Sequence, residues 1–155
     1  MIATGPASER DFDAIAALLA ANHLPTAGVR ECLGHAVVAR ENGRLVGCAA
    51  LEVYADGALL RSVAVDERLR GRGVGHQLTE AALALARQAG APAAFLLTTT
   101  AGEFFPRFGF ERITRDEVPA GVRDSIEFTS ACPASAIVMR LALRARSSAK
   151  SASLV

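Results

Sequence analysis

The sequence is poor in residues that mark several classes of protein. It holds no tryptophan and one tyrosine in 155 residues, and its acidic and basic side chains nearly cancel, at a net charge of +1. Such a balance argues against a general nucleic-acid-binding surface, because those domains carry a clear basic excess. No hydrophobic run reaches the length of a membrane span, and no signal-peptide pattern opens the sequence. We therefore expect no nucleic-acid or membrane partner and a cytoplasmic location.

Cysteines are also scarce, and their spacing argues against a disulfide framework. Cys32, Cys48 and Cys132 contain no C-x-x-C pair, and an odd number of thiols cannot pair completely. Three thiols can in principle bind zinc or trivalent arsenic. We favour separate reduced thiols in a cytoplasmic protein and predict no metal site.

Hydrophobic residues make up 51% of the chain, which predicts one globular α/β domain over residues 1–143. The tail 144–155 is rich in Ser, Ala, Arg and Lys and is predicted to be flexible. Apolar periodicity and turn residues predict strands near 1–4, 92–100 and 135–143, helices near 8–21 and 74–90, a short helix near 104–108 followed by a strand, a helical segment at 118–128, and three antiparallel strands within 35–65. Asn42-Gly43 and Asp56-Gly57 are the expected hairpin turns, and Ser8 with Asp11 resembles a capping box.

The stretch "VAVDERLRGRGVG", residues 63–75, places glycines and arginines between an apolar strand and a helix. The first turn of a helix leaves amide groups unpaired, and glycines allow an anion to approach the backbone. The spacing does not fit a Rossmann fingerprint, since His76 stands where a third glycine is needed, and no Gly-Lys-Ser/Thr follows for a P-loop. A phosphate site is predicted, with a solvated basic turn or a nucleotide-binding module as alternatives.

Within this stretch, Arg70-x-x-Gly73-x-Gly75 resembles the acetyl-CoA pyrophosphate loop of the GCN5-related N-acetyltransferase (GNAT) family. "FFPRFGF" resembles the late F-x-x-x-G-F element of that family, and the resemblance extends nearly to Leu143. It implies an α/β (α+β) GNAT fold: a mixed, mostly antiparallel sheet of about seven strands with helices on both faces. Strands four and five are expected to splay apart and form the acetyl-CoA cleft.

The resemblance implies acetyl-CoA as the acetyl donor and direct transfer to an amine in a ternary complex, with no metal. The backbone amide near Val63 is expected to polarise the acetyl carbonyl. Phe105 stands where many relatives have a tyrosine that protonates the leaving thiolate, so solvent is expected to supply that proton. The residues expected to contact the donor are Val63, Ala64, Val65, Arg70, Gly71, Arg72, Gly73, Val74, Gly75, Phe104 and Phe105.

An ion pair is predicted on the acceptor side. If Asp56-Gly57 closes a two-residue hairpin, Glu52 lies opposite Arg61, on a face shared with Cys48 and Val63. Glu52 can take the ammonium proton of an amino acid, and Arg61 can bind its carboxylate. The alternative is a surface ion pair worth under about 1 kcal/mol.

Two further segments supply acceptor-site candidates. The hydroxyl groups of Thr98, Thr99 and Thr100 can bind substrate or a proton-relaying water, although β-propensity and a helix N-cap explain threonines there equally well. The resemblance places Leu24, Pro25 and Thr26 in the connection that forms one wall of the acceptor site.

The finer resemblance points to amino-acid substrates. "LRSVAV", "LLTT" and "FFPRFGF" are similar to the acetyltransferase domain of N-acetylglutamate synthases, and "LPTAGV" and "CPASAIVM" resemble small N-acetyltransferases associated with arsenic resistance. We expect an acetyl-CoA-dependent N-acetyltransferase for a small amino acid or an amino-acid-like toxin, such as a glutamate analogue. The alternatives are acetylation of a protein N-terminus or another small amine, and a non-catalytic acyl-CoA sensor. A homodimer through the last strand is also expected.

Overall fold

The computed structural model describes residues 2–99, 101–125 and 136–143. Some residues named in the sequence analysis lie outside the described residues. They are Thr100, Cys132 with the three residues that follow it in "CPASAIVM", and the predicted tail 144–155. The strands are β1 (Ile2–Pro6), β2 (Ala36–Glu41), β3 (Arg44–Tyr54), β4 (Gly57–Val65), β5 (Ala93–Thr98), β6 (Glu111–Ile113) and β7 (Ile137–Ala142), and the α-helices are α1 (Phe12–Ala21), α2 (Val74–Gln88) and α3 (Ala120–Arg123).

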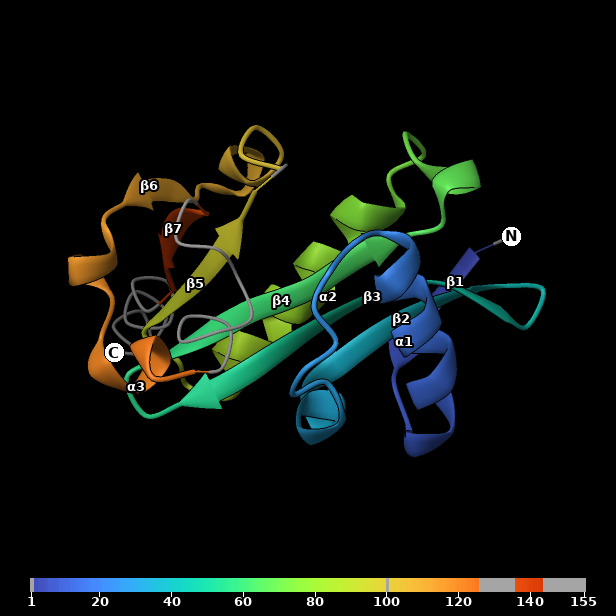
Figure 1. Ribbon diagram of the computed structural model, residues 1–155, viewed down its shortest axis with the longest axis horizontal. Coiled ribbons are helices and arrows are strands. Elements are labelled where there is room, and N and C mark those ends of the chain that lie inside the picture. Colours follow the sequence, from blue (N-terminus) through green and yellow to red (C-terminus); the bar gives the residue numbers. More distant parts are fainter. Residues whose placement is uncertain (1, 100, 126–135, 144–155) are drawn as a thin grey trace, which may run out of the picture. The chain divides into compact units, whose positions relative to one another are not determined.

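The seven strands form one mixed sheet in the order β1-β2-β3-β4-β5-β7-β6 (Figure 1). β1 with β2, β2 with β3, β5 with β7 and β6 with β7 are antiparallel, whereas β4 and β5 are parallel. The predicted sheet is confirmed. By its internal contacts the chain divides into a first unit, Met1–Glu52 with Leu60–Leu85, and a second unit, Val53–Leu59 with Ala86–Val155.

In the first unit, α1 and α2 cover opposite faces of the strands (Figure 1). Cys48 belongs to an apolar cluster with Ile15 and Leu19 of α1. Its neighbour Gly47 faces α2, because a Cβ added there would lie 2.8 Å from Leu78 Cδ1. Successive residues of a strand point to opposite faces, so β3 carries one helix on each side.

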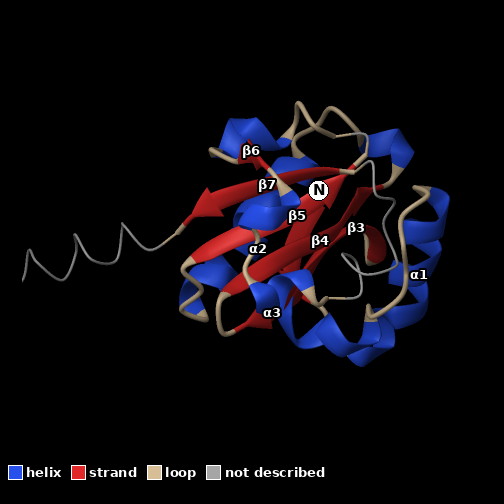
Figure 2. Cartoon of the chain, turned by 60° about the vertical axis from the view of Figure 1, so that its left-hand side comes forward, coloured by secondary structure: helices blue, strands red, loops and turns tan. Residues whose placement is uncertain are grey.

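The second unit is built on β5, β7 and β6, which lie side by side (Figure 2). The start of β4 joins β5 through the pairs Ala58↔Ala94 and Leu59↔Phe95. Phe95 and Leu59 pack with Val122 of α3 in the apolar core of this unit.

One of the two predicted hairpin turns is confirmed and the other is wrong. Asn42 and Gly43 have φ angles of 54° and 82°, as a tight turn of this kind requires. The turn between β3 and β4 is Ala55-Asp56 instead, and Gly57 already begins β4. Tertiary contacts decide this: the Asp56 carboxylate accepts the Gly121 N–H at 2.8 Å, and Phe95 packs so closely on Gly57 that an added Cβ would lie 2.8 Å from its ring.

The remaining elements agree closely with those predicted from the sequence. Gly109 is left-handed at a φ of 101° and ends the short 3₁₀ helix Phe105–Phe108 before β6. The helix predicted near residue 118 is restricted to α3 within the described residues. Among the elements that the structure describes, no helix has both the length and the apolar character to cross a membrane.

Candidate functional site

The glycine-arginine turn takes the backbone conformation that its glycines permit. Gly71 and Gly73 have φ angles of 85° and 83°. These values are unfavourable for any residue that has a Cβ atom. A Cβ at either position would meet nothing within 4 Å, so backbone conformation, not space, requires glycine here. Gln77 N donates to Gly73 O at 3.0 Å, which begins the hydrogen bonding of α2. The amides of the turn that precede this bond have no partner within the helix and can bind an anion.

One of the two arginines of this turn, Arg70, is bound by a side chain at the end of α1. Both Arg70 and Arg72 are exposed. Arg70 Nη2 donates to the Asn22 side-chain oxygen, and Asn22 Nδ2 in turn donates to Leu18 O at 2.9 Å. Asn22, which follows the last residue of α1, therefore fixes the position of Arg70. No motif in the sequence indicated this role for Asn22.

A distortion in β4 lies between the ion pair and the glycine-arginine turn. Ser62 is 9% exposed and has a φ of 60°, an unfavourable conformation for a residue with a Cβ. Arg61 before it and Ala64 after it both contact the α1 side, since Arg61 reaches Pro25 O and Ala64 joins the α1 cluster. Strict alternation would put them on opposite faces, so Ser62 acts as the extra residue of a β-bulge.

The bulge corrects the predicted face of Val63. Ala64, not Val63, packs with Cys48, because the extra residue reverses the alternation after Arg61. Cys48 Sγ donates to Ser62 O at 3.2 Å, and Arg61 Nε donates to Ser62 Oγ at 3.0 Å. Two side chains therefore hold the strained residue in place.

The predicted ion pair forms in the first unit. Arg61 Nη1 lies 2.7 Å from Glu52 Oε2, and the two side chains are 0% and 13% exposed. The guanidinium also donates from Nη2 to Pro25 O at 3.4 Å. A guanidinium removed from water and bonded on three sides is a rigid group, unlike the surface ion pair of the alternative interpretation.

The register behind this pair differs from the expected one. Counting back from the Ala55-Asp56 turn places Ala50, not Glu52, opposite Arg61. Arg61 reaches Glu52 along the diagonal, a distance that a long side chain spans. The pairing was predicted correctly, but from a turn displaced by one residue.

The three residues predicted to form one wall of the acceptor site differ in whether they contact the Glu52–Arg61 ion pair. Pro25 contacts Arg61 through its carbonyl oxygen. Leu24 packs against the apolar cluster of α1, and Thr26 is exposed, with its carbonyl accepting Val29 N–H at 3.2 Å. Only Pro25 of these three contacts the ion pair through a hydrogen bond that we can describe.

The remaining candidates belong to the second unit. Thr98 Oγ1 accepts the Ala101 N–H at 2.9 Å, and Thr99 is exposed. The helix N-cap interpretation is wrong for Thr98, because the next helix, the 3₁₀ helix Phe105–Phe108, has Phe104 as its N-cap. Phe105 is 6% exposed and meets Phe104 edge-on, with the ring centroids 5.0 Å apart. Its ring is therefore part of the packing of this unit.

The acetyltransferase (GNAT) domain family matches residues 33–112. This segment includes the ion pair, the bulge and the glycine-arginine turn. The chain belongs to the GNAT family.

Relatives of this GNAT chain are named for amino-acid acetylation. An amino-acid acetyltransferase of Mycobacterium tuberculosis is 40% identical over 85 residues, 54% of this chain and 48% of that protein. An amino-acid acetyltransferase of Neisseria meningitidis is 33% identical over 53% of this chain and 19% of its own length. The chain thus spans about half or less of these curated relatives.

Solved structures agree with the fold. Rv2747 of Mycobacterium tuberculosis, in complex with CoA and NLQ, matches with a TM-score of 0.78 and 29% identity, over 91% of this chain and 99% of that chain. N-acetylglutamate synthase of Neisseria gonorrhoeae, complexed with coenzyme A and N-acetyl-glutamate, has a TM-score of 0.79 at 24% identity, over 92% and 35%. At that identity the second match supports the fold alone.

Proposed function

We propose that this GNAT domain transfers the acetyl group of acetyl-CoA to the amine of a small amino acid. The observation that carries the proposal is the Arg61–Glu52 pair: a fully buried guanidinium beside a carboxylate that water still reaches. The pair is followed along β4 by the bulge and then by the glycine-arginine turn. Groups suited to an amino acid and to a diphosphate are therefore carried by one continuous segment of chain.

On the donor side, the turn 70–73 would bind the diphosphate. Its left-handed glycines expose backbone amides, and Arg70 and Arg72 add positive charge. The Val63 amide would donate to the acetyl carbonyl and stabilise the charge that develops there.

On the acceptor side, Arg61 would bind the carboxylate of the amino acid. Its contact with Pro25 O, at 3.4 Å, is the longest of its three described bonds and the one that a carboxylate would replace. Glu52 would take a proton from the ammonium group, directly or through water.

The chemistry balances without a metal or an acyl-enzyme. The neutral amine attacks the thioester carbonyl carbon, so a C–N bond forms and the C–S bond breaks. After the attack, the nitrogen loses one more proton to solvent, Glu52 releases to solvent the proton that it took, and the CoA thiolate takes one proton from solvent. The products are the N-acetylated amino acid and CoA.

Glutamate and its analogues are the substrates that we propose within this class. The names of the curated relatives and the resemblance of "LRSVAV" to N-acetylglutamate synthases support an amino acid. The resemblance of "LPTAGV" to arsenic-resistance acetyltransferases supports analogues whose side-chain carboxylate is replaced by an arsenical or phosphinate group.

A thiol-release assay tests the proposal. Purified protein and acetyl-CoA are incubated with the twenty amino acids, glutamate analogues, short peptides and amines that lack a carboxylate. We expect release with amino acids, and least with amines that lack a carboxylate. Turnover confined to peptides would favour N-terminal acetylation, and CoA binding without any turnover would favour a sensor.

A glycine pair tests the donor site separately. Gly71→Ala forces an unfavourable φ in the turn, whereas Gly34→Ala adds a Cβ to a glycine that has open space and no positive φ. Calorimetry should give a dissociation constant for CoA at least about tenfold higher for Gly71→Ala. Equal constants for the two variants would exclude the turn as the diphosphate site.

A further inference from the structure

The peptide group between Ser62 and Val63 is oriented differently from the peptide groups of an ordinary strand. The φ of 60° at Ser62 turns this peptide away from the orientation that alternation would give it. A trans peptide holds its C=O and N–H on opposite sides, and the described residues contain no cis peptide. Whatever fixes the Ser62 carbonyl therefore also fixes the direction of the Val63 N–H.

The Cys48 thiol on β3 fixes that carbonyl. Its Sγ lies 3.2 Å from Ser62 O, and Cys48 is 2% exposed. Burial raises the pKa of the Cys48 thiol to about 12, so the sulfur keeps its proton at neutral pH and remains a donor. With the carbonyl turned toward Cys48, the Val63 N–H points away from Cys48 and β3. Val63 itself is half-buried, so water reaches part of this residue.

The bulge also needs an external restraint. A serine in the left-handed region costs on the order of 1 kcal/mol or more and persists only when its surroundings hold it there. Arg61 Nε binds the Ser62 hydroxyl, which restrains the side chain. The thiol restrains the peptide group that follows, which the Arg61 contact does not reach.

We propose that Cys48 is a positioning residue for acetyl transfer, whose thiol orients the Ser62–Val63 peptide so that the Val63 amide points at the acetyl carbonyl. The inference rests on the proposed function. Cys48 need not touch either substrate. Its contribution is to kcat, because an amide held at the angle that the transition state needs stabilises that state without reorganisation.

The chain offers a matched control in its other described cysteine. Cys32 is also buried, at 4% exposure, and its Sγ donates to Val29 O at 3.3 Å. Cys32→Ala and Cys48→Ala thus each remove one sulfur atom and one S–H···O=C bond of nearly equal length from the first unit. Cys48→Ala also removes the contact of the sulfur with the Ala64 backbone amide, so only this variant loses bonds to the bulge and to the residues that follow it.

The kinetic test compares Cys48→Ala, Cys48→Ser and Cys32→Ala with acetyl-CoA and L-glutamate, or the best amino acid of the substrate screen. We expect kcat of Cys48→Ala to fall roughly threefold to tenfold, with KM for the acceptor and the CoA dissociation constant within about twofold of wild type. Serine keeps a donor, so Cys48→Ser should recover most of kcat, and Cys32→Ala should match wild type. Unchanged kcat in Cys48→Ala, or an equal loss in Cys32→Ala, would overturn the inference.

A second readout does not depend on turnover. The residual dipolar coupling of the Val63 N–H bond, measured by NMR on the CoA-bound protein, reports the direction of that bond. We expect it to change in Cys48→Ala and to stay constant in Cys32→Ala; the same coupling in both would overturn the inference. A wild-type protein that acetylates nothing would instead remove the proposed function, while the coupling would still show whether Cys48 holds the peptide.

Discussion

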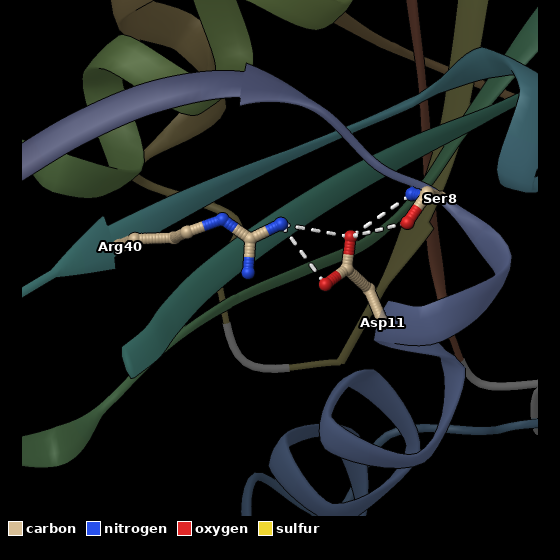
Figure 3. A network of polar contacts seen from close by, with 3 residues as sticks. All are labelled: Ser8, Asp11 and Arg40. Atoms are coloured by element: carbon tan, nitrogen blue, oxygen red, sulfur yellow. Dashed lines mark hydrogen bonds and ion pairs between the residues drawn. The ribbon is translucent and has the colours of Figure 1, made fainter. Parts of the chain in front are cut away.

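Two of the arginine–carboxylate pairs of the first unit, Asp11–Arg40 and Glu52–Arg61, use the same groups in opposite ways. In the Asp11–Arg40 pair the carboxylate is the more buried partner, with side chains 9% and 37% exposed. Asp11 Oδ1 and Oδ2 each lie 2.9 Å from Arg40 Nη2, and Asp11 Oδ2 also accepts from Ser8 N and Oγ (Figure 3). The carboxylate is surrounded by donors from its own helix start and from β2, as a structural contact requires.

In the Glu52–Arg61 pair the arginine is the buried partner and the carboxylate is the one that water reaches. Arg61 divides its donors among Glu52, Ser62 and Pro25 and so spans the bulge and the α1 connection. The buried carboxylate of Asp11 accepts four hydrogen bonds from Ser8 and Arg40, as a contact that stabilises the fold does. In the proposed function, the buried guanidinium and the partly exposed carboxylate of the other pair bind and deprotonate the amino acid.

Removing the buried guanidinium should have the largest effect. We expect Arg61→Met to lower the free energy of unfolding by about 3 kcal/mol, because the Glu52 carboxylate loses its ion pair with the guanidinium. We expect kcat/KM to fall by at least about a thousandfold, since the carboxylate contact and the restraint on Ser62 are lost together. Urea unfolding and the thiol-release assay measure both quantities. Arg40→Met is the control, and activity loss of similar size there would erase the distinction between the pairs.

Neutralising the partly exposed carboxylate should affect activity more than stability. Glu52→Gln keeps an oxygen that accepts from Arg61 but leaves the buried guanidinium without a counter-charge, so we expect the free energy of unfolding to fall by about 1–3 kcal/mol. Loss of the proton acceptor should lower kcat about a hundredfold. If kcat and its pH profile match those of wild type, Glu52 is not the base.

Local patterns predicted much of this arrangement. Several turns need a positive φ, which few residues other than glycine and asparagine adopt, so the residue type itself predicts the backbone conformation. These positions are Asn42-Gly43, Gly71, Gly73 and Gly109. The same reasoning failed at Asp56-Gly57. There the hydrogen bond from Gly121 and the packing of Phe95 come from residues distant in sequence, and no local rule contains them.

The bulge was the main feature that the sequence did not predict. Serine does not mark a positive φ, and Cys48 and Ser62 lie fourteen positions apart. The hydrogen bond from Cys48 to Ser62 joins β3 to β4, and no local sequence pattern contains it. The Glu52–Arg61 contact survived the error in register because a diagonal neighbour is still within reach of an arginine.

The Asp11–Arg40 pair should respond in the opposite manner to the Glu52–Arg61 pair, for which we propose a role in the reaction. Asp11→Asn removes a charge from a carboxylate that binds Ser8 and Arg40, and should lower the free energy of unfolding by about 1–2 kcal/mol. Activity should stay within about twofold of wild type. Asp13→Asn, two residues later in the first turn of α1 and exposed, is the control for loss of charge at the helix start. Equal destabilisation by both changes would show that the contacts of Asp11 add nothing.

The smallest expected effect is the pH dependence of that stabilisation. Burial acts to raise the pKa of Asp11, but hydrogen bonds from Ser8 and Arg40 and the charge of Arg40 outweigh it, and the net pKa lies below the ordinary 3.8. A carboxyl whose pKa is lower in the folded state stabilises the fold fully above its unfolded pKa. This stabilisation is lost as pH falls through the folded value. We expect the difference in unfolding free energy between wild type and Asp11→Asn to be constant from pH 7 to about 5 and to shrink toward pH 3. A difference that persists unchanged at pH 3 would mean that the ionised form of Asp11 contributes nothing to the fold.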